Sequence, residues 1–163
     1  MADAPHTLAL ADGQFDTILC WETIEHFNFN PVKFVRDLFR LLRPGGKVYL
    51  TVPNKASLQS LVGLIGGRGE HSLIESYFTF EDYESNGKKC FYGFHWREYS
   101  ATELSALFAR VGFQIEKSGT LFVNQEATTR SWWRPLVRSA IRAVGPLVPR
   151  FGTTVYLVAT KPG

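Results

Sequence analysis

Cysteine is scarce in this sequence, and long apolar runs are absent. Cys20 and Cys90 are the only cysteines, which is typical of reduced thiols in a cytosolic protein rather than of a disulfide framework. No stretch of about 18 consecutive apolar residues occurs, so no membrane-spanning helix is expected. The N-terminus has no basic segment followed by an apolar block, so we predict no signal peptide and a cytoplasmic location.

Excess charge is also lacking over most of the chain. The net charge is +3, and one segment without a single acid contains five arginines: Arg130, Arg134, Arg138, Arg142 and Arg150. Without these five the net charge would fall from +3 to −2. The basic character is therefore local, which argues against general nucleic-acid binding. The 163 residues are 45% hydrophobic and 14% aromatic, which predicts one folded domain over residues 1–163.

The most regular stretch runs from Phe15 to Asn54. Thr17 to Trp21 is a short apolar run without polar alternation, which indicates a strand buried on both faces of a parallel sheet. Val48 to Val52 is a second buried strand, ended by Pro53. Two such strands joined by one helix predict a right-handed crossover unit.

The residues between these strands predict that helix. Pro31 suits the first helical turn, and apolar side chains then recur at three- and four-residue steps: Val32, Val35, Leu38, Phe39 and Leu42. Pro44-Gly45-Gly46 ends the helix, because proline cannot continue it and glycine accepts a left-handed turn.

Four motifs lie in order along this stretch: Asp12-Gly13-Gln14-Phe15-Asp16, Glu22-Thr23-Ile24-Glu25-His26, Leu42-Arg43-Pro44-Gly45-Gly46 and Pro53-Asn54. On these motifs the chain resembles the second half of a class I S-adenosylmethionine-dependent methyltransferase of the type 11 or ubiquinone-biosynthesis kind. The resemblance implies an α/β fold with a Rossmann-like sheet that is mostly parallel, with one antiparallel strand near the C-terminus. It also implies S-adenosylmethionine as the cofactor.

The glycine-rich turn with which that family first holds its cofactor is missing. No strand followed by Gly-x-Gly-x-Gly precedes Asp3, so the chain resembles an N-terminally truncated domain. The glycines that follow the second strand are interpreted as a flexible connector: Gly63, Gly66, Gly67 and Gly69. The first strand would then lack a neighbour, so either a second chain covers its open edge, as in a dimer, or the protein is poorly soluble.

Residues 55–99 correspond to a variable insertion in the resembled family. A short helix is predicted over Ser57–Ile65 and a turn at Asn86–Lys89, and Cys90 is expected in a loop. An aromatic cluster either lines a substrate pocket or packs as core: Phe91, Tyr92, Phe94 and Trp96.

The C-terminal part contains a helix, two strands and a basic segment. Ser100 to Val111 is a helix with a Ser100/Glu103 capping box, ended by Gly112. Phe113 begins a strand, and Thr153–Thr160 resembles the antiparallel strand. Between them, residues 130–151 form a basic amphipathic segment with Trp133 on its apolar face. Such a helix either lies on a membrane surface, giving peripheral membrane association, or packs over the sheet.

The resemblance places the cofactor at the carboxyl end of the first strand, where open parallel sheets bind ligands. Cys20, Trp21 and Glu22 would border its adenine and methionine parts. Asp3-Ala4 corresponds to a pair whose acid accepts a hydrogen bond from the adenine amine; the alternative is a solvated Asp3 near a terminus.

His26 is the candidate catalytic residue, as a general base, with a loop-anchoring role as the alternative. We predict no metal. The weaker alternative is a divalent ion on Glu22, Glu25 and His26, because small-RNA 2′-O-methyltransferases and ubiquinone-pathway O-methyltransferases in the resembled family hold an ion with such a set. His71 or His95 would supply a further ligand.

Methyl transfer from a sulfonium centre is an in-line displacement, so the protein chiefly aligns the acceptor and removes its proton. We expect O-methylation of a small-molecule or lipid-linked acceptor. The alternative is a catalytically incomplete methyltransferase-like remnant or interaction module.

Overall fold

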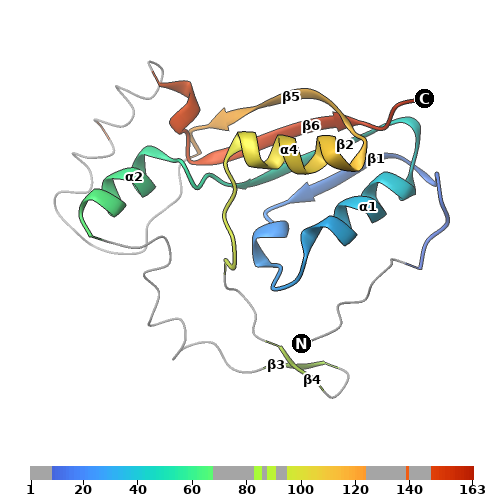
Figure 1. Ribbon diagram of the computed structural model, residues 1–163, viewed down its shortest axis with the longest axis horizontal. Helices are drawn as coiled ribbons and strands as arrows, with labels where there is room; N and C mark the ends of the chain where they lie inside the picture. Colours follow the sequence, from blue (N-terminus) through green and yellow to red (C-terminus); the bar gives the residue numbers. More distant parts are fainter. Residues whose placement is uncertain (1–8, 68–82, 86–87, 91–94, 124–138, 140–147) are drawn as a thin grey trace.

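A four-stranded sheet lies at the centre of the computed structural model, which describes residues 9–67, 83–85, 88–90, 95–123, 139 and 148–163 (Figure 1). Its strands, in spatial order, are β1 (Phe15–Trp21), β2 (Leu42–Pro53), β6 (Thr154–Thr160) and β5 (Gln114–Leu121). The helices are η1 (Ile24–His26), α1 (Pro31–Leu41), α2 (Leu58–Ile65), α4 (Ala101–Val111) and η3 (Pro149–Phe151). Two short strands, β3 (Tyr83–Ser85) and β4 (Lys88–Cys90), pair with each other.

Strand β6 runs against its neighbours. β1 and β2 are parallel, whereas β6 pairs antiparallel with both β2 and β5. Three strands therefore point one way and β6 points the other, which confirms the predicted Rossmann-like sheet with one antiparallel strand near the C-terminus. The parallel pair β1–β2 is connected through α1, since parallel neighbours need a crossover connection.

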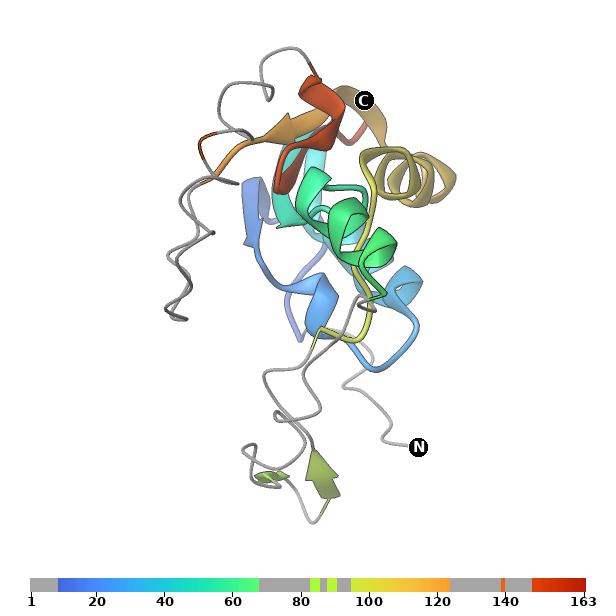
Figure 2. The same ribbon diagram turned by 90° about the vertical axis from the view of Figure 1, so that its left-hand side faces the viewer.

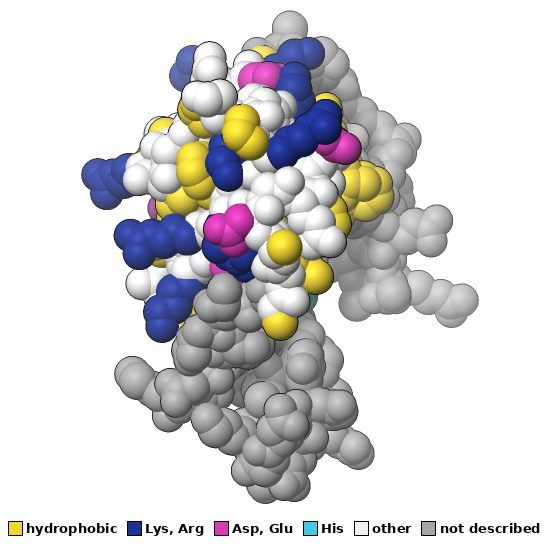
Figure 3. All heavy atoms as spheres, turned by 90° about the vertical axis from the view of Figure 1, so that its right-hand side faces the viewer, with side chains coloured by type: hydrophobic (Ala, Val, Ile, Leu, Met, Phe, Trp, Pro, Cys, Tyr) yellow, Lys and Arg dark blue, Asp and Glu magenta, His cyan; other side chains and the backbone are white. Residues whose placement is uncertain are grey.

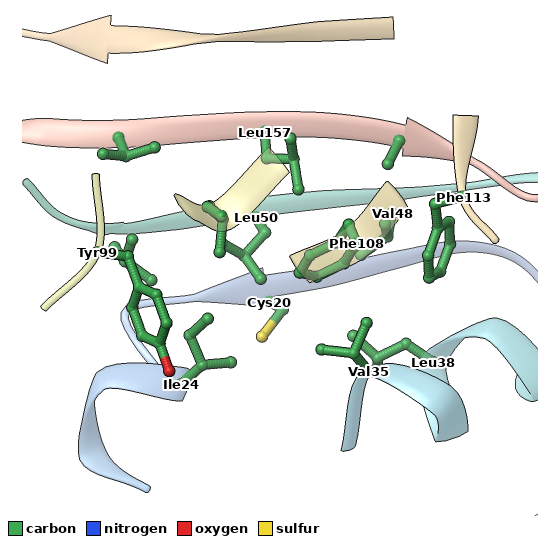
Figure 4. Packing of buried hydrophobic residues seen from close by; sticks show 14 of the residues in the cluster. Cys20, Ile24, Val35, Leu38, Val48, Leu50, Tyr99, Phe108, Phe113 and Leu157 are labelled. Carbon is green, nitrogen blue, oxygen red and sulfur yellow. The ribbon is translucent and has the colours of Figure 1, made fainter. Parts of the chain in front are cut away.

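The core lies between one face of this sheet and the helices α1 and α4 (Figures 1 and 2). Alternate residues of β2 and β6 point into it, among them Val48, Leu50 and Leu157 (Figure 4). Val35 and Leu38 of α1 and Phe108 of α4 close it from the other side. Burial of this apolar layer is the main stabilising contribution to the domain.

The opposite face of the sheet is open. The side chain of Leu19 is 58% exposed and that of Trp21 is 63% exposed, and no described element covers them. The prediction that β1 is buried on both faces is therefore wrong for the described part of the chain. Both residues belong to the apolar run that suggested two-sided burial. They alternate with Ile18 and Cys20, which face the helices, so their side chains lie on the opposite face of the sheet. As expected, β1 also lies at the edge of the sheet.

The helix α1 ends one residue earlier than the apolar stripe predicts. Asn30 caps its start by accepting a hydrogen bond from the amide of Val32 (3.0 Å). Leu42 is buried, but its backbone is extended and begins β2. The predicted proline–glycine stop is thus part of a longer strand, with a shift in register opposite Phe15–Thr17.

The helix α4 has the predicted caps. Ser100 and Glu103 form the reciprocal capping box, and Gly112 ends the helix with a left-handed φ of 116°. A Cβ at Gly112 would also lie 3.3 Å from the ring of Phe39, so both backbone conformation and space favour glycine there. The predicted strand from Phe113 is confirmed as β5, and Phe113 itself is a core residue.

Three local predictions about the insertion are corrected. Gly63 lies inside α2 rather than in a flexible connector, and the chain leaves the helix only at Gly66 and Gly67. Lys88 and Lys89 belong to β4 rather than to a turn, and Cys90 ends that strand rather than lying in a loop. The predicted helix over Ser57–Ile65 is confirmed as α2, with Ser57 as its N-cap.

Several predicted features lie outside the described residues. They are Asp3, Ala4, Gly69, His71, Phe91, Tyr92, Phe94 and nearly all of residues 130–151. No helix in the described ranges is long and apolar enough to cross a membrane.

The end of the sheet where β1 and β2 begin is rich in lysine and arginine (Figure 3). Three of these side chains are paired with acids, in the ion pairs Arg40–Asp12, Arg43–Asp16 and Lys47–Glu116. Arg40 and Arg110 lie in the last turns of α1 and α4, where positive charge is favourable to the helix dipole. This basic end is opposite the carboxyl ends of β1 and β2.

We predict that Ser100→Ala lowers the free energy of unfolding by about 1 kcal/mol, because the amide of Glu103 loses its cap acceptor. Urea denaturation followed by circular dichroism measures the change. Thr102→Ala is the matched control, since Thr102 is exposed in the same helix and should change stability by less than about 0.5 kcal/mol. Equal effects of the two substitutions would contradict the capping role.

Candidate active site

The chain turns sharply at the carboxyl end of β1. Glu22 has a φ of +44°, which is uncommon for any residue other than glycine. Its amide donates to the carbonyl of Thr51 on β2 (2.9 Å), and the hydroxyl of Thr23 donates to the carbonyl of Trp21 (2.7 Å). These bonds fix a strained turn at the edge where a parallel sheet offers a ligand site.

The structure brings some of the predicted cofactor residues to this edge. Trp21 and Glu22 are exposed at the turn. Cys20 is buried, and its side chain points toward the helices and into the core (Figure 4). Burial raises the pKa of the Cys20 thiol to about 11, so it is a core thiol rather than a nucleophile. Only the backbone of Cys20 is therefore available to a ligand at this edge.

A cluster of three ionisable side chains lies one helical turn beyond Glu22. Glu25, His26 and His95 each offer a potential ligand atom, and these atoms lie within 4.8 Å of one another. The imidazole rings of His26 and His95 meet edge to face with centroids 4.8 Å apart, and Nε2 of His26 lies 3.8 Å from Oε1 of Glu25. Of the two histidines considered as further ligands, His95 is the one that the described structure places here.

Backbone bonds hold the two halves of the cluster together. The carbonyl of Glu25 accepts hydrogen bonds from the amides of Trp96 (2.7 Å) and Arg97 (3.3 Å). Ile24 is fully buried in the core beside Tyr99, so η1 is anchored on its inner side (Figure 4). Tyr99 in turn forms a parallel bridge with Asn54.

Asn54 explains why the Pro53-Asn54 motif lies where it does. Its side-chain amide donates to the carbonyl of Gly152 (2.6 Å), and its Oδ1 accepts from the amide of Ala56 (3.0 Å). Its backbone amide donates to the carbonyl oxygen of Thr153 (2.8 Å). This buried residue therefore joins the end of β2 to the start of β6 and to the segment that carries His95.

Glu25 is the most unusual residue of the cluster. Its side chain is fully buried, and neither carboxylate oxygen has a hydrogen-bond partner among the described residues. Burial raises the pKa of Glu25 to about 7, and the negative charge of Glu22 acts in the same direction. The pKa of His95 is also raised, chiefly by its contact with Glu98 (3.4 Å) and further by the charge of Glu25.

One feature of this site was left open by the sequence and another was missed. His95 was one of two alternatives for a further ligand, and no periodicity links residue 95 to residue 25, because the connection is a backbone bond between distant segments. Glu98, the partner of His95, follows it by three residues, and that spacing was the available signal.

The sheet order and the turn after β1 define a Rossmann-like methyltransferase fold, and comparison with known proteins gives the family. Residues 2–118 match the family model described as a methyltransferase domain. The chain therefore belongs to the class I S-adenosylmethionine-dependent methyltransferases.

Relatives agree with this assignment. The chain is 30% identical over 115 residues (71% of this chain and 35% of the relative) to a probable S-adenosylmethionine-dependent methyltransferase of Mycolicibacterium smegmatis. It is 35% identical over 112 residues (68% of this chain and 40% of the relative) to a ubiquinone biosynthesis O-methyltransferase of Xanthomonas euvesicatoria. The matched stretch thus covers well under half the length of these relatives.

Solved structures show the same fold. A SAM-dependent methyltransferase from Thermotoga maritima has a TM-score of 0.56 at 18% identity, with 96% of this chain and 60% of that chain covered. A methyltransferase from Bacillus halodurans has a TM-score of 0.57 at 14% identity, with 97% of this chain and 75% of that chain covered. Nearly all of this chain is therefore matched, whereas a substantial part of each of those proteins lies outside the match.

We predict that metal-free protein loses stability as the pH rises from about 4.5 to above 7. The folded state keeps a proton on Glu25 (pKa about 7) that the unfolded state has already lost near the ordinary value of 4.5. Glu25→Gln should remove this part of the dependence and raise the free energy of unfolding at pH 8 by about 2–3 kcal/mol. Denaturant titrations in chelator at several pH values measure it.

Glu116→Gln is the control of opposite sign. The contact with Lys47 lowers the pKa of Glu116, so this carboxylate contributes stability that is present above pH 4.5 and lost in acid. Its removal should therefore give no gain at pH 8. If the wild-type protein is as stable at pH 8 as the Glu25→Gln variant, the ionised carboxylate of Glu25 does not destabilise the fold and the prediction is wrong.

Proposed function

We propose that this chain forms one side of the active site of an enzyme that transfers a methyl group from S-adenosylmethionine to an oxygen of a small-molecule or lipid-linked acceptor. The observation that carries the proposal is the buried Glu25 carboxylate beside two imidazoles, at the carboxyl edge where this fold binds ligands. The ubiquinone O-methyltransferases among the relatives support oxygen as the acceptor atom.

Trp21 and Glu22 are suited to the cofactor. An exposed indole at the end of a strand offers a flat apolar surface to a purine or a sulfonium methyl group. The turn at Glu22 holds this indole at the edge through the bond to Thr51. These residues orient the cofactor, while the cofactor itself supplies the reactive carbon and the leaving group.

The cluster of Glu25, His26 and His95 is suited to the acceptor. A carboxylate whose pKa lies near 7 can take the proton of an acceptor hydroxyl at neutral pH. The side chains of His26 and His95 are similarly exposed (38% and 36%), whereas Glu25 is buried, so a substrate would meet an imidazole first. His26 stays the candidate general base, with the Glu25 carboxylate behind it.

The same three groups fit a divalent cation. Two imidazole nitrogens and one carboxylate oxygen form a donor set common for transition metals, and a cation would satisfy the unpartnered oxygens of Glu25. When bound, such an ion would polarise the acceptor hydroxyl. The charge of Glu22 also acts on both Glu25 and His95.

The first test is binding of S-adenosylmethionine to the chain by calorimetry. We expect weak binding, with a Kd of about 1 mM, because one side of the site is present. Trp21→Ala should weaken it about tenfold, through loss of a stacking surface. Ile65→Ala is the matched control, since Ile65 is 88% exposed on α2. An absence of both heat and thermal protection at 10 mM ligand, about ten times that Kd, would exclude the cofactor role of this chain.

The second test concerns the cation. Mn²⁺ at about 100 times its Kd should stabilise the protein by about 2.7 kcal/mol, and Glu25→Gln should abolish the effect. Affinity should rise as the pH passes about 7, because Glu25 (pKa about 7) must lose its proton to bind the ion. Glu116→Gln, which changes a carboxylate away from the cluster, should respond like the wild type. Retention of the full Mn²⁺ effect in Glu25→Gln would sink the metal assignment.

A further inference from the structure

His95 joins Glu25 and His26 from a distant part of the chain, and one acidic side chain lies against its ring. Oε1 of Glu98 is 3.4 Å from Nδ1 of His95, at the long end of the hydrogen-bond range. The side chain of Glu98 is only 16% exposed. Glu98 is not one of the three residues whose potential ligand atoms gather in the cluster. It therefore touches the cluster through its contact with His95.

This contact decides which nitrogen of His95 carries the proton. An ionised carboxylate has no hydrogen to donate, so a neutral imidazole must donate to Glu98 from Nδ1. Nε2 then keeps its lone pair and can bind a cation. A neutral imidazole without such a partner exchanges between two tautomers, and in one of them Nε2 is protonated and cannot bind. Glu98 thus selects the form of His95 that a cation requires.

The neighbours of Glu98 on both sides are anchored. On one side, the amides of Trp96 and Arg97 donate to the carbonyl of Glu25 (2.7 and 3.3 Å). On the other side, Tyr99 is 3% exposed and forms a bridge to the residue that follows β2. A carboxylate between two anchored neighbours has a defined position, which is what a group that orients another side chain needs.

The pair of His95 and Glu98 has the arrangement that metal-binding histidines commonly have. Such a histidine donates its other ring N–H to a carboxylate, which fixes the tautomer and the ring orientation and strengthens the binding nitrogen as a donor. Here Nδ1 lies toward the carboxylate, and Nε2 is left for the ligand. The negative charge of Glu98 also acts on Glu25, so it adds to the field that attracts a cation to the cluster.

We propose that Glu98 is a positioning residue, which holds His95 as the Nδ1–H tautomer and so leaves Nε2 available to the ligand of the cluster. The proposal rests on the proposed function, in which Glu25, His26 and His95 together hold a divalent cation. Glu98 itself needs no contact with the cation or with the acceptor.

A purely structural role for Glu98 makes different predictions. In that role its loss would lower the stability of the fold without a specific change at His95. The backbone bonds of Trp96 and Arg97 to Glu25 do not involve the Glu98 side chain, so they are kept when it is replaced. The tautomer of His95 is therefore the readout that separates the two roles.

The first measurement is the tautomer of His95 in the metal-free chain, by NMR of the imidazole nitrogens at alkaline pH, where the ring is neutral. We expect Nδ1–H in the wild type. Glu98→Ala should shift the ring toward Nε2–H, because Nδ1 loses its acceptor. Glu98→Gln should restore part of the Nδ1–H form, since an amide oxygen of the same reach can still accept. Glu116→Ala, which removes a carboxylate paired with Lys47, should leave the tautomer unchanged.

The second measurement is the affinity for Mn²⁺, by electron paramagnetic resonance. Glu98→Ala should weaken binding about 10- to 100-fold, as is usual when a metal-binding histidine loses the carboxylate that orients it. Glu98→Gln should weaken it less, and Glu116→Ala should bind like the wild type. Thermal unfolding of each metal-free variant shows whether a loss of affinity merely follows a loss of fold.

The outcomes separate this proposal from the proposed function. A wild-type His95 that is protonated at Nε2 overturns the positioning role, and this result needs no variant to fold. A tautomer or an Mn²⁺ affinity that Glu98→Ala leaves unchanged overturns it as well. If the wild type binds no Mn²⁺ but the tautomer responds to Glu98→Ala, the cation of the proposed function is wrong and the control of His95 by Glu98 is supported.

Discussion

The parallel pairing of β1 with β2 is the constraint on which the rest of this structure depends. It sets the direction of β1, so that Trp21 and Glu22 lie beside Thr51 at one edge of the sheet. It requires the crossover through α1, which covers one face and leaves the other bare. The candidate site and the open face are thus two consequences of one hydrogen-bonded ladder.

The second layer of organisation is a small set of backbone bonds that carry ionisable groups to that edge. The carbonyl of Glu25 accepts hydrogen bonds from the amides of Trp96 and Arg97. The β-bridge between Tyr99 and Asn54 fixes the same segment to the end of β2. These contacts bury a carboxylate whose oxygens accept no hydrogen bond from the described residues. Such a group lowers the stability of a fold, since a buried acid without hydrogen bonds costs several kcal/mol. Its retention is a physical reason to look for chemistry there.

The sequence contained enough information for the elements and much of the turn geometry. The Ser100–Glu103 spacing and Gly112 predicted both ends of α4, because caps are local interactions. The end of α1 was missed by one residue, since Leu42 is apolar in either a helix or a strand. Gly63 was misassigned because glycine lowers helix propensity without preventing a helix.

The site was less predictable than the elements. Trp21 and Glu22 could be placed from the resemblance, but the inward direction of Cys20 depends on which face of β1 carries the helices. His95 lies about seventy residues from Glu25, and no local pattern records their contact. Long-range backbone pairing is not encoded in spacing, which is why only the structure selects His95.

The apolar run of β1 can now be interpreted more closely. A strand covered on one face only would alternate, with polar residues at the exposed positions. Thr17 fits that expectation, whereas Leu19 and Trp21 do not. Their apolar character, together with Tyr49, Tyr156 and Val158 across the sheet, is a composition suited to a second packed layer. The composition of β1 is therefore that of a strand with apolar contacts on both faces. The described part of the chain covers only the face toward α1.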